Sequence, residues 1–187
     1  FCCLLSPTMA AKQTTERLFY TTEFDSLFMQ GLCHLHADSL TLAQESFKKC
    51  QKLESKSAVV AYQLANISAM KRDTTTAIKL LKKAVRYNKS NYFYYSTLAE
   101  WYTAINDYKA ATKIYQTICK KFPDKEYPLY MLSRCYLQLG DYAKSIKTYE
   151  QLETRIGVTA EMSLEKAYVM ALQGDWDGMK REFERIH

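Results

Sequence analysis

The residues best suited to chemistry lie close together early in the chain: Cys33, His34 and His36. Thiolate and imidazole groups are common metal ligands, nucleophiles and bases. Side chains two positions apart on a helix point in divergent directions, so His34 and His36 are poorly placed to share a metal ion. The third histidine is the terminal His187, and there is no glycine-rich phosphate loop and no His-Glu-x-x-His motif. We predict no catalytic residue, metal site, cofactor or small-molecule substrate.

Basic side chains recur along one stripe of several segments, within a net charge of +6. A stripe of this kind usually keeps an exposed helix face solvated. RNA binding also needs aromatic or arginine platforms beside the charge, and most aromatic residues here lie elsewhere. An RNA-binding helical repeat is therefore kept only as a lower-ranked alternative. The stripe comprises Lys48, Lys49, Lys52, Lys79, Lys82, Lys83, Arg86, Lys113, Lys120 and Lys121.

The composition indicates helices as the scaffold. With 48% hydrophobic and 25% charged residues among 187, the chain can bury a core and does not have a disordered composition. Its 5 glycines and 3 prolines are too few for a β-sandwich or barrel, which needs turn residues about every 8 to 12 positions. No apolar run is long enough to span a membrane.

A repeat of 34 residues runs through most of the sequence without a gap. Its units are residues 24–57, 58–91, 92–125 and 126–159, with a shorter fifth unit at 160–187 and a lead-in at 12–23. Position 8 of each unit is small (Gly31, Ala65, Ala99, Ser133, Ala167), and so is position 20 in four of them (Ala43, Ala77, Ala111, Ser145). Position 24 is large (Phe47, Leu81, Tyr115, Tyr149, Phe183). Small residues allow two antiparallel helices to approach closely, and large ones fill the remaining groove.

Residues typical of helix ends lie at the expected boundaries between the helices. Gly140 and Gly174, at position 15, can adopt the left-handed conformation that ends a first helix. Asp73 and Asp107 follow the same slot in other units and are available to cap the second helix. Pro128 suits a first helical turn. Each unit is therefore predicted to be a helix pair.

The motif Tyr95-x2-Leu98-Ala99-x2-Tyr102, followed by Ala111-x3-Tyr115 and Pro123, resembles the tetratricopeptide repeat. The resemblance extends over residues 24–187 and is weakest in the first unit, where His34 occupies the tyrosine position. It implies an all-α fold, a right-handed α-solenoid of about five antiparallel helix pairs. In this family the first helices line a concave surface, at positions 2, 5, 9, 12 and 13. Carried over by register, these positions give the partner-binding candidates Phe28, Tyr62, Asn66, Met70, Phe93, Glu100, Tyr127, Tyr130, Arg134 and Tyr168.

The expected function is a non-enzymatic scaffold that binds a peptide or a partner protein in this concave groove. Aromatic, methionine and arginine side chains are enriched at the energetic centres of protein interfaces. A terminal repeat usually has a polar cap, so either the chain continues beyond His187 or the face with Phe183 and Ile186 packs on a partner. The second possibility gives an alternative function, a structural module that self-assembles through its last helix. That reading predicts a homo-oligomer.

The cysteines are expected to fill core positions of the repeat. Cys33 and Cys135 occupy position 10, Cys50 position 27 and Cys119 position 28, where other units carry mainly apolar residues. Whether Cys119 and Cys135 form a disulfide stays open, since their helices belong to adjacent units.

Residues 1–11 are predicted to be the remnant of a signal peptide, because an apolar run is followed by small residues at Ala10 and Ala11. This implies an exported, periplasmic bacterial protein. The alternative is a frayed apolar N-terminus on a cytoplasmic protein.

Overall fold

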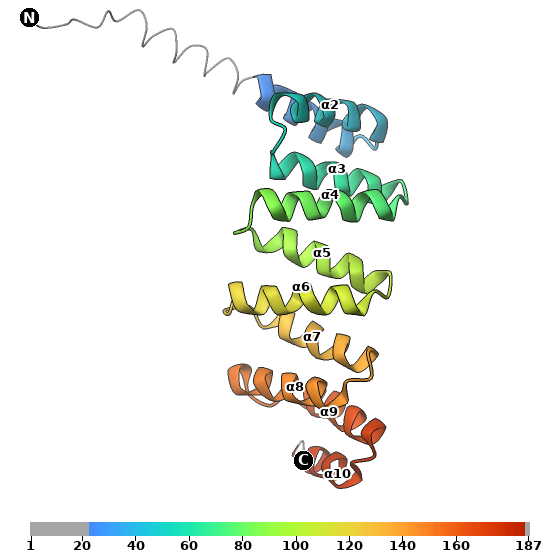
Figure 1. The fold of residues 1–187 in the computed structure, drawn as a ribbon, viewed down its shortest axis with the longest axis vertical. Helices are drawn as coiled ribbons and strands as arrows, with labels where there is room; N and C mark the ends of the chain where they lie inside the picture. Colours follow the sequence, from blue (N-terminus) through green and yellow to red (C-terminus); the bar gives the residue numbers. More distant parts are fainter. Residues whose placement is uncertain (1–22, 186–187) are drawn as a thin grey trace, which may run out of the picture. The chain divides into compact units, whose positions relative to one another are not determined.

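The computed structural model describes residues 23–185, which form helices joined by short loops, without a β-strand in that range (Figure 1). The predicted signal remnant, all but the end of the lead-in, and Ile186 lie outside the described residues. Residues 23–36 are helical, and the following helices are α2 (Leu40–Leu53), α3 (Ala58–Met70), α4 (Thr74–Tyr87), α5 (Tyr92–Ala104), α6 (Tyr108–Lys121), α7 (Tyr127–Gln138), α8 (Tyr142–Ile156), α9 (Ala160–Gln173) and α10 (Trp176–Glu184). The predicted all-α fold of antiparallel helix pairs is confirmed.

The chain divides into two compact units between Lys89 and Ser90, a division that the repeat pattern did not predict. Helix 23–36 and α2 to α4 belong to unit 1, and α5 to α10 belong to unit 2. In both units the two helices of a repeat pack together, and second helices also pack on the next first helix, as α2 does on α3, α6 on α7 and α8 on α9. Each unit therefore has a layered core of its own.

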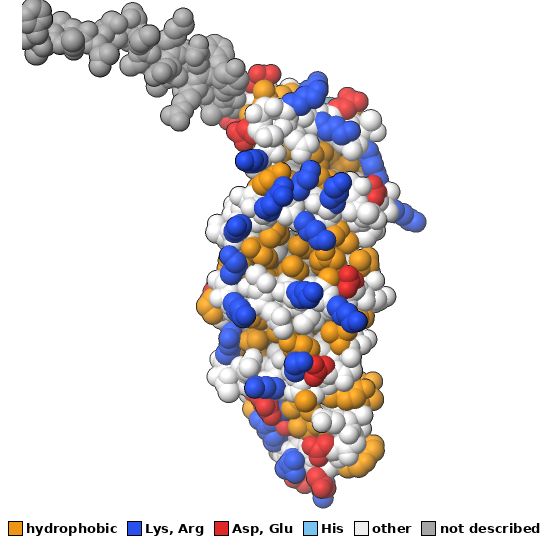
Figure 2. All heavy atoms as spheres, viewed as in Figure 1, with side chains coloured by type: hydrophobic (Ala, Val, Ile, Leu, Met, Phe, Trp, Pro, Cys, Tyr) orange, Lys and Arg blue, Asp and Glu red, His pale blue; other side chains and the backbone are white. Residues whose placement is uncertain are grey.

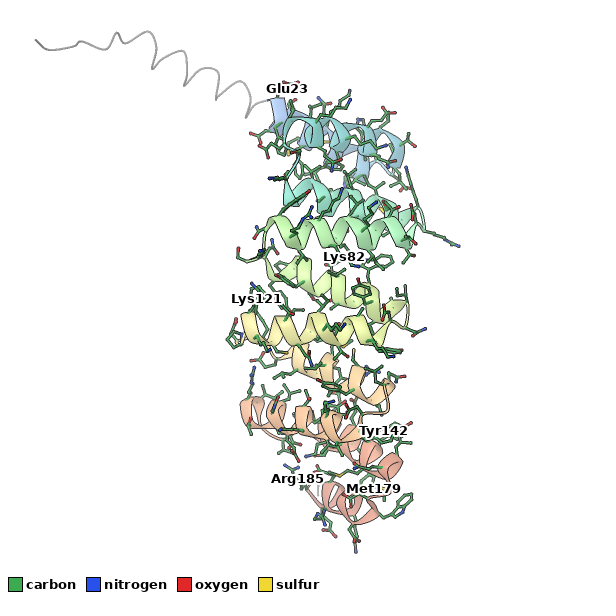
Figure 3. All side chains as sticks on the ribbon, in the orientation of Figure 1. Glu23, Lys82, Lys121, Tyr142, Met179 and Arg185 are labelled. Atoms are coloured by element: carbon green, nitrogen blue, oxygen red, sulfur yellow. The ribbon has the colours of Figure 1, made fainter. Side chains whose placement is uncertain are left out.

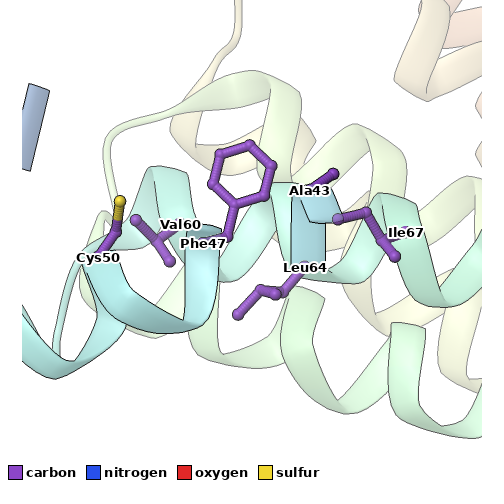
Figure 4. Close-up of a cluster of buried hydrophobic side chains, with 6 residues drawn as sticks. All are labelled: Ala43, Phe47, Cys50, Val60, Leu64 and Ile67. Atoms are coloured by element: carbon purple, nitrogen blue, oxygen red, sulfur yellow. The ribbon is translucent and has the colours of Figure 1, made fainter. Parts of the chain in front are cut away.

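The core of unit 1 shows how the small and large repeat positions fit together. Ala43, Phe47, Cys50, Val60, Leu64 and Ile67 form its buried cluster (Figure 4). Gly31 lies so close to Phe47 that an added Cβ atom would come within 2.8 Å of the ring. The small residue at position 8 therefore makes room for the large residue at position 24.

In unit 2 the two small positions, 8 and 20, are in contact with each other. Ser133 and Ser145 are both fully buried, and the Ser145 hydroxyl donates to the Ser133 backbone carbonyl at 2.9 Å. Tyr115 and Tyr149, at position 24, have no exposed surface. Position 24 of the last repeat differs, because 41% of Phe183 is exposed.

The predicted turns and caps are confirmed. Gly140 and Gly174 have φ values of 72° and 83°, in the left-handed region. Asp73 and Asp107 accept hydrogen bonds from backbone N–H groups in the first turns of α4 and α6, both at 3.0 Å. Pro128 lies in the first turn of α7.

One expectation about the cysteines is wrong. Cys50 and Cys135 are buried and Cys119 is partly buried, but Cys33 is exposed. The equivalent Ile67 is buried in a cluster with α2 residues, whereas Cys33 lies on the first described helix, where no earlier helix within residues 23–185 covers it. Cys119 and Cys135 are free thiols here, and burial raises the pKa of both.

Candidate functional site

The predicted groove residues of unit 1 do not all face solvent. Phe28 stacks on Phe24 with ring centroids 6.0 Å apart and meets the buried Phe47 edge-on at 5.3 Å. It therefore contributes to the core of unit 1. Tyr62 and Asn66 are half-buried, and Met70 is exposed.

The candidates of unit 2 project from three successive first helices. Phe93, on α5, is 71% exposed, and Glu100 on the same helix accepts a hydrogen bond from Ser96 Oγ at 2.7 Å. Tyr127, on α7, and Tyr168, on α9, are 49% and 58% exposed. Large aromatic side chains left this exposed on one face are typical of surfaces that bind another molecule.

Tyr130 and Arg134 are held in place between α7 and α9. The Tyr130 hydroxyl donates to Glu165 Oε1 at 2.8 Å, and the Tyr149 hydroxyl donates to the other oxygen of the same carboxylate. The Tyr130 ring meets Tyr149 edge-on, and the Arg134 guanidinium lies 5.7 Å from the centre of the Tyr130 ring. Partial burial, together with the hydrogen bond to Glu165, raises the pKa of Tyr130. The phenol therefore stays protonated at neutral pH and keeps donating to Glu165.

Two hollows are lined by residues of α7 and α9. The first, the Glu126 hollow, has a volume of about 300 Å³ and is lined by Glu126, Tyr127, Tyr130, Leu152, Ile156, Thr159, Glu161 and Met162. The second, the Arg134 hollow, has a volume of about 350 Å³ and is lined by Arg134, Leu137, Gln138, Leu164, Glu165 and Tyr168. Tyr127 and Tyr130 thus share one hollow, and Arg134 and Tyr168 share the other. We call the solvent-facing side of α5, α7 and α9, with both hollows, the first-helix face of unit 2.

Several residues that line the hollows were not among the predicted site residues. Glu161, Leu137 and Gln138 occupy repeat positions 2, 12 and 13, so the register alone was sufficient to find them. Glu165 lies at position 6, outside that set, and its role depends on two tyrosines that a periodic pattern does not bring together.

A buried ionic cluster fixes the far side of α9. Lys166 is 2% exposed, and its ammonium group lies 3.1 Å from Glu153 on α8 and 2.9 Å from Glu182 on α10. Arg185, at the C-terminal end of α10 (Figure 3), pairs with Glu182 at 2.8 Å and with Glu153 at 3.4 Å. Two positive and two negative charges therefore balance where three helices meet, which is a structural arrangement.

The basic stripe is solvated. Its side chains on α4 and α6, among them Lys82 and Lys121 (Figure 3), are mostly exposed and are spread among uncharged neighbours (Figure 2). A hollow of about 520 Å³ in unit 1 is lined by Lys56, Arg86 and Tyr87, with the Arg86 guanidinium 5.2 Å from the Tyr87 ring centre. This hollow contains one arginine–tyrosine pair, whereas proteins that bind single-stranded RNA use a succession of stacking platforms.

Between residues 23 and 185, no three His, Cys, Asp or Glu side chains come together in a way that could hold a metal ion. No helix in that part of the chain combines the length and the apolar character needed to cross a bilayer.

Comparison with known proteins supports the repeat assignment. Residues 102–155 match the sequence model of the tetratricopeptide repeat family. Among solved structures, the MamA protein is similar over 87% of this chain and 88% of its own, with 18% identity and a TM-score of 0.73. A MamA structure from Desulfovibrio magneticus RS-1 gives 14% identity and a TM-score of 0.70, covering 87% of this chain and 92% of that one.

YrrB, described as a TPR protein with an unusual peptide-binding site, is 13% identical with a TM-score of 0.70 over 88% of this chain and 89% of its own. No curated protein sequence is significantly similar to the chain. At these identities the structural matches establish the fold alone, and that fold is the α-solenoid of tetratricopeptide repeats.

Proposed function

We propose that this chain is a protein-interaction module that binds a peptide or a partner protein on the first-helix face of unit 2. The observation that carries the proposal is that Tyr127, Tyr130, Arg134 and Tyr168 line two neighbouring hollows on α7 and α9. Grooves lined by aromatic side chains with a few polar groups are typical of peptide-binding surfaces. The tetratricopeptide-repeat fold supports the proposal, and the description of YrrB names a peptide-binding site in a protein of this fold.

The rigid setting of Tyr130 favours binding. Its hydroxyl is held by Glu165 and its ring by Tyr149 and Arg134, so little side-chain freedom remains to be lost when a ligand arrives. Tyr127 and Tyr168 are more exposed and supply the apolar area that a partner would bury.

The test is a pair of double variants in the full chain. Tyr127→Ala with Tyr168→Ala removes two exposed rings from the first-helix face, while Leu42→Ala with Leu53→Ala changes two exposed apolar residues on α2. A photocrosslinking residue at Leu164, which lines the Arg134 hollow, should capture a specific partner in source cells. We expect the first double variant to abolish that adduct and the second to leave it intact. Equal adducts from both variants would remove the first-helix face as the binding site.

The second candidate function, self-assembly through α10, has its own observation. Trp176 is 63% exposed and Phe183 is 41% exposed on this last helix. Light scattering at increasing protein concentration tests it, because a dimer that disappears in the Phe183→Asp variant would support docking through α10. A constant monomer mass excludes this function.

We also propose that the protein is exported, on the basis of the apolar and small residues in the first eleven positions. Cell fractionation combined with N-terminal sequencing of the recovered protein tests this. Recovery from the cytoplasm with residues 1–11 intact would contradict export.

A further inference from the structure

The Glu126 hollow differs from the Arg134 hollow in charge. Glu126 and Glu161 stand at its rim, and none of its lining residues is basic. In the Arg134 hollow, one arginine and one glutamate balance each other. Within residues 23–185, neither Glu126 nor Glu161 has a hydrogen bond or an ion pair from its carboxylate, and both are exposed.

The basic residue that precedes each of these two glutamates in the sequence already has a partner. Lys125 pairs with Asp124 at 3.1 Å, and Arg155 donates to the Pro123 backbone carbonyl at 2.7 Å. The two carboxylates lie at the N-terminal ends of α7 and α9, where each helix dipole contributes about +0.5 charge. These partial charges offset only part of the two full negative charges, and no lining residue supplies a positive one.

Beneath the rim the hollow is apolar. Leu152 and Met162 are 2% and 3% exposed and form its floor, and the exposed Ile156 forms one side. The Thr159 hydroxyl oxygen accepts from the Met162 backbone N–H at 3.2 Å and so caps α9. The rings of Tyr127 and Tyr130 complete the wall. At about 300 Å³ the hollow is at the small end of ligand pockets, which suits a single long side chain.

We propose that the Glu126 hollow is a socket for a lysine or arginine side chain, and hence that the partner presents a basic segment to unit 2. The aliphatic stem of such a side chain would lie on Leu152, Ile156 and Met162, while its charged head would reach the carboxylates and the tyrosine ring faces. An acidic side chain would meet repulsion from the rim, and an apolar one would leave both carboxylates unpaired. This inference rests on the proposed function and names the chemistry of the partner.

The test uses Met162 as a reporter in the full chain. Protein labelled with ¹³C at its methionine methyl groups is titrated with the N-acetyl, N-methylamide derivatives of lysine, norleucine and glutamate. We expect the lysine derivative to shift the Met162 methyl signal saturably, the norleucine derivative to bind more weakly and the glutamate derivative to cause no shift. The Met131 and Met170 signals, from residues that do not line the hollow, serve as internal controls.

A matched pair of variants then separates the socket from general charge. Glu126→Gln with Glu161→Gln should weaken the lysine derivative about three- to tenfold, as expected for two exposed charge pairs. Glu150→Gln with Glu184→Gln removes the same charge from exposed positions on α8 and α10 and should change nothing. Equal binding of lysine and norleucine derivatives, or equal weakening by both variants, would overturn the socket. If the socket fails but Tyr127→Ala with Tyr168→Ala still abolishes partner capture, the proposed function survives without it.

Discussion

At the scale of single residues, position 15 of each repeat requires a left-handed backbone whichever residue occupies it. The φ angle is positive at Asp38, Arg72 and Asn106, as it is at Gly140 and Gly174. Asn and Asp tolerate this region better than other residues, whereas a long side chain costs about 1–2 kcal/mol there. Arg72 is therefore the least suitable residue in this column.

We predict that Arg72→Gly raises the free energy of unfolding by about 1 kcal/mol, because glycine adopts a positive φ without strain. Urea denaturation of the full chain measures the change. Arg72→Ala keeps the strain and serves as the control, with no gain expected. A glycine variant no more stable than the alanine variant would contradict this reading of position 15.

Single residues also show where sequence reasoning reaches its limit. The small and large columns were predictable because they describe contacts inside a helix pair, which recur in every repeat. Lys166 breaks such a column, since position 7 is leucine in three other repeats, at Leu64, Leu98 and Leu132. Its burial is explained by Glu153 and Glu182 on two other helices, and a pattern read along one column does not contain those partners.

At the scale of elements, the ionic cluster fastens α10 to α8 and α9. We predict that Lys166→Met destabilises the protein by about 3 kcal/mol, because it leaves two carboxylates close together with only the partly exposed Arg185 to balance them. Hydrogen exchange should become faster in α10. The control is Lys180→Met, which replaces an exposed lysine on α10 itself and should leave the exchange rates unchanged. If α10 exchanges as slowly in the Lys166→Met variant as in the unaltered protein, apolar packing alone holds this helix.

The same cluster predicts a pH dependence. Burial by itself raises the pKa of Glu182, but hydrogen bonds from Lys166 and Arg185 outweigh it and hold this pKa below its usual range. A lowered folded-state pKa adds stability above the unfolded-state value, and this stability is lost as the pH falls through the folded-state value. We therefore expect the melting temperature to decrease as the pH is lowered from about 4.5, which is the ordinary pKa of a glutamate. The fall should be smaller in Glu182→Gln; an identical fall in both proteins would assign the pH dependence to other carboxylates.

The position of part of the candidate site on its helix could also be predicted from the sequence. The repeat register places Tyr127, Tyr130 and Arg134 on one stripe of α7, because positions 2, 5 and 9 follow the helical period. It does not show that position 5 meets position 24 edge-on, as Phe28 meets Phe47 and Tyr130 meets Tyr149, so that both rings are half-buried. The surroundings of the two rings differ, because Phe28 also stacks on Phe24, whereas the Tyr130 hydroxyl donates to Glu165.

At the scale of the whole molecule, the two units hold unequal numbers of helix pairs. Unit 2 contains three complete pairs, α5 to α10, with its own buried tyrosines and the ionic cluster, and unit 1 contains two pairs within residues 23–89. A single helix pair cannot bury its apolar face alone, and about three stacked repeats are needed for stability. The size of the array therefore favours unit 2 as an independently folding part.

We predict that residues 90–187, expressed alone, melt cooperatively and are helical by circular dichroism, whereas residues 1–89 alone have lower stability. Because both hollows of the first-helix face are built only from unit 2 residues, the fragment should also give the same Met162 shift with the lysine derivative as the full chain. A fragment 90–187 that is folded but unresponsive, beside a responsive full chain, would show that the socket depends on residues outside unit 2. An unfolded fragment would show that the stability of its three pairs depends on unit 1.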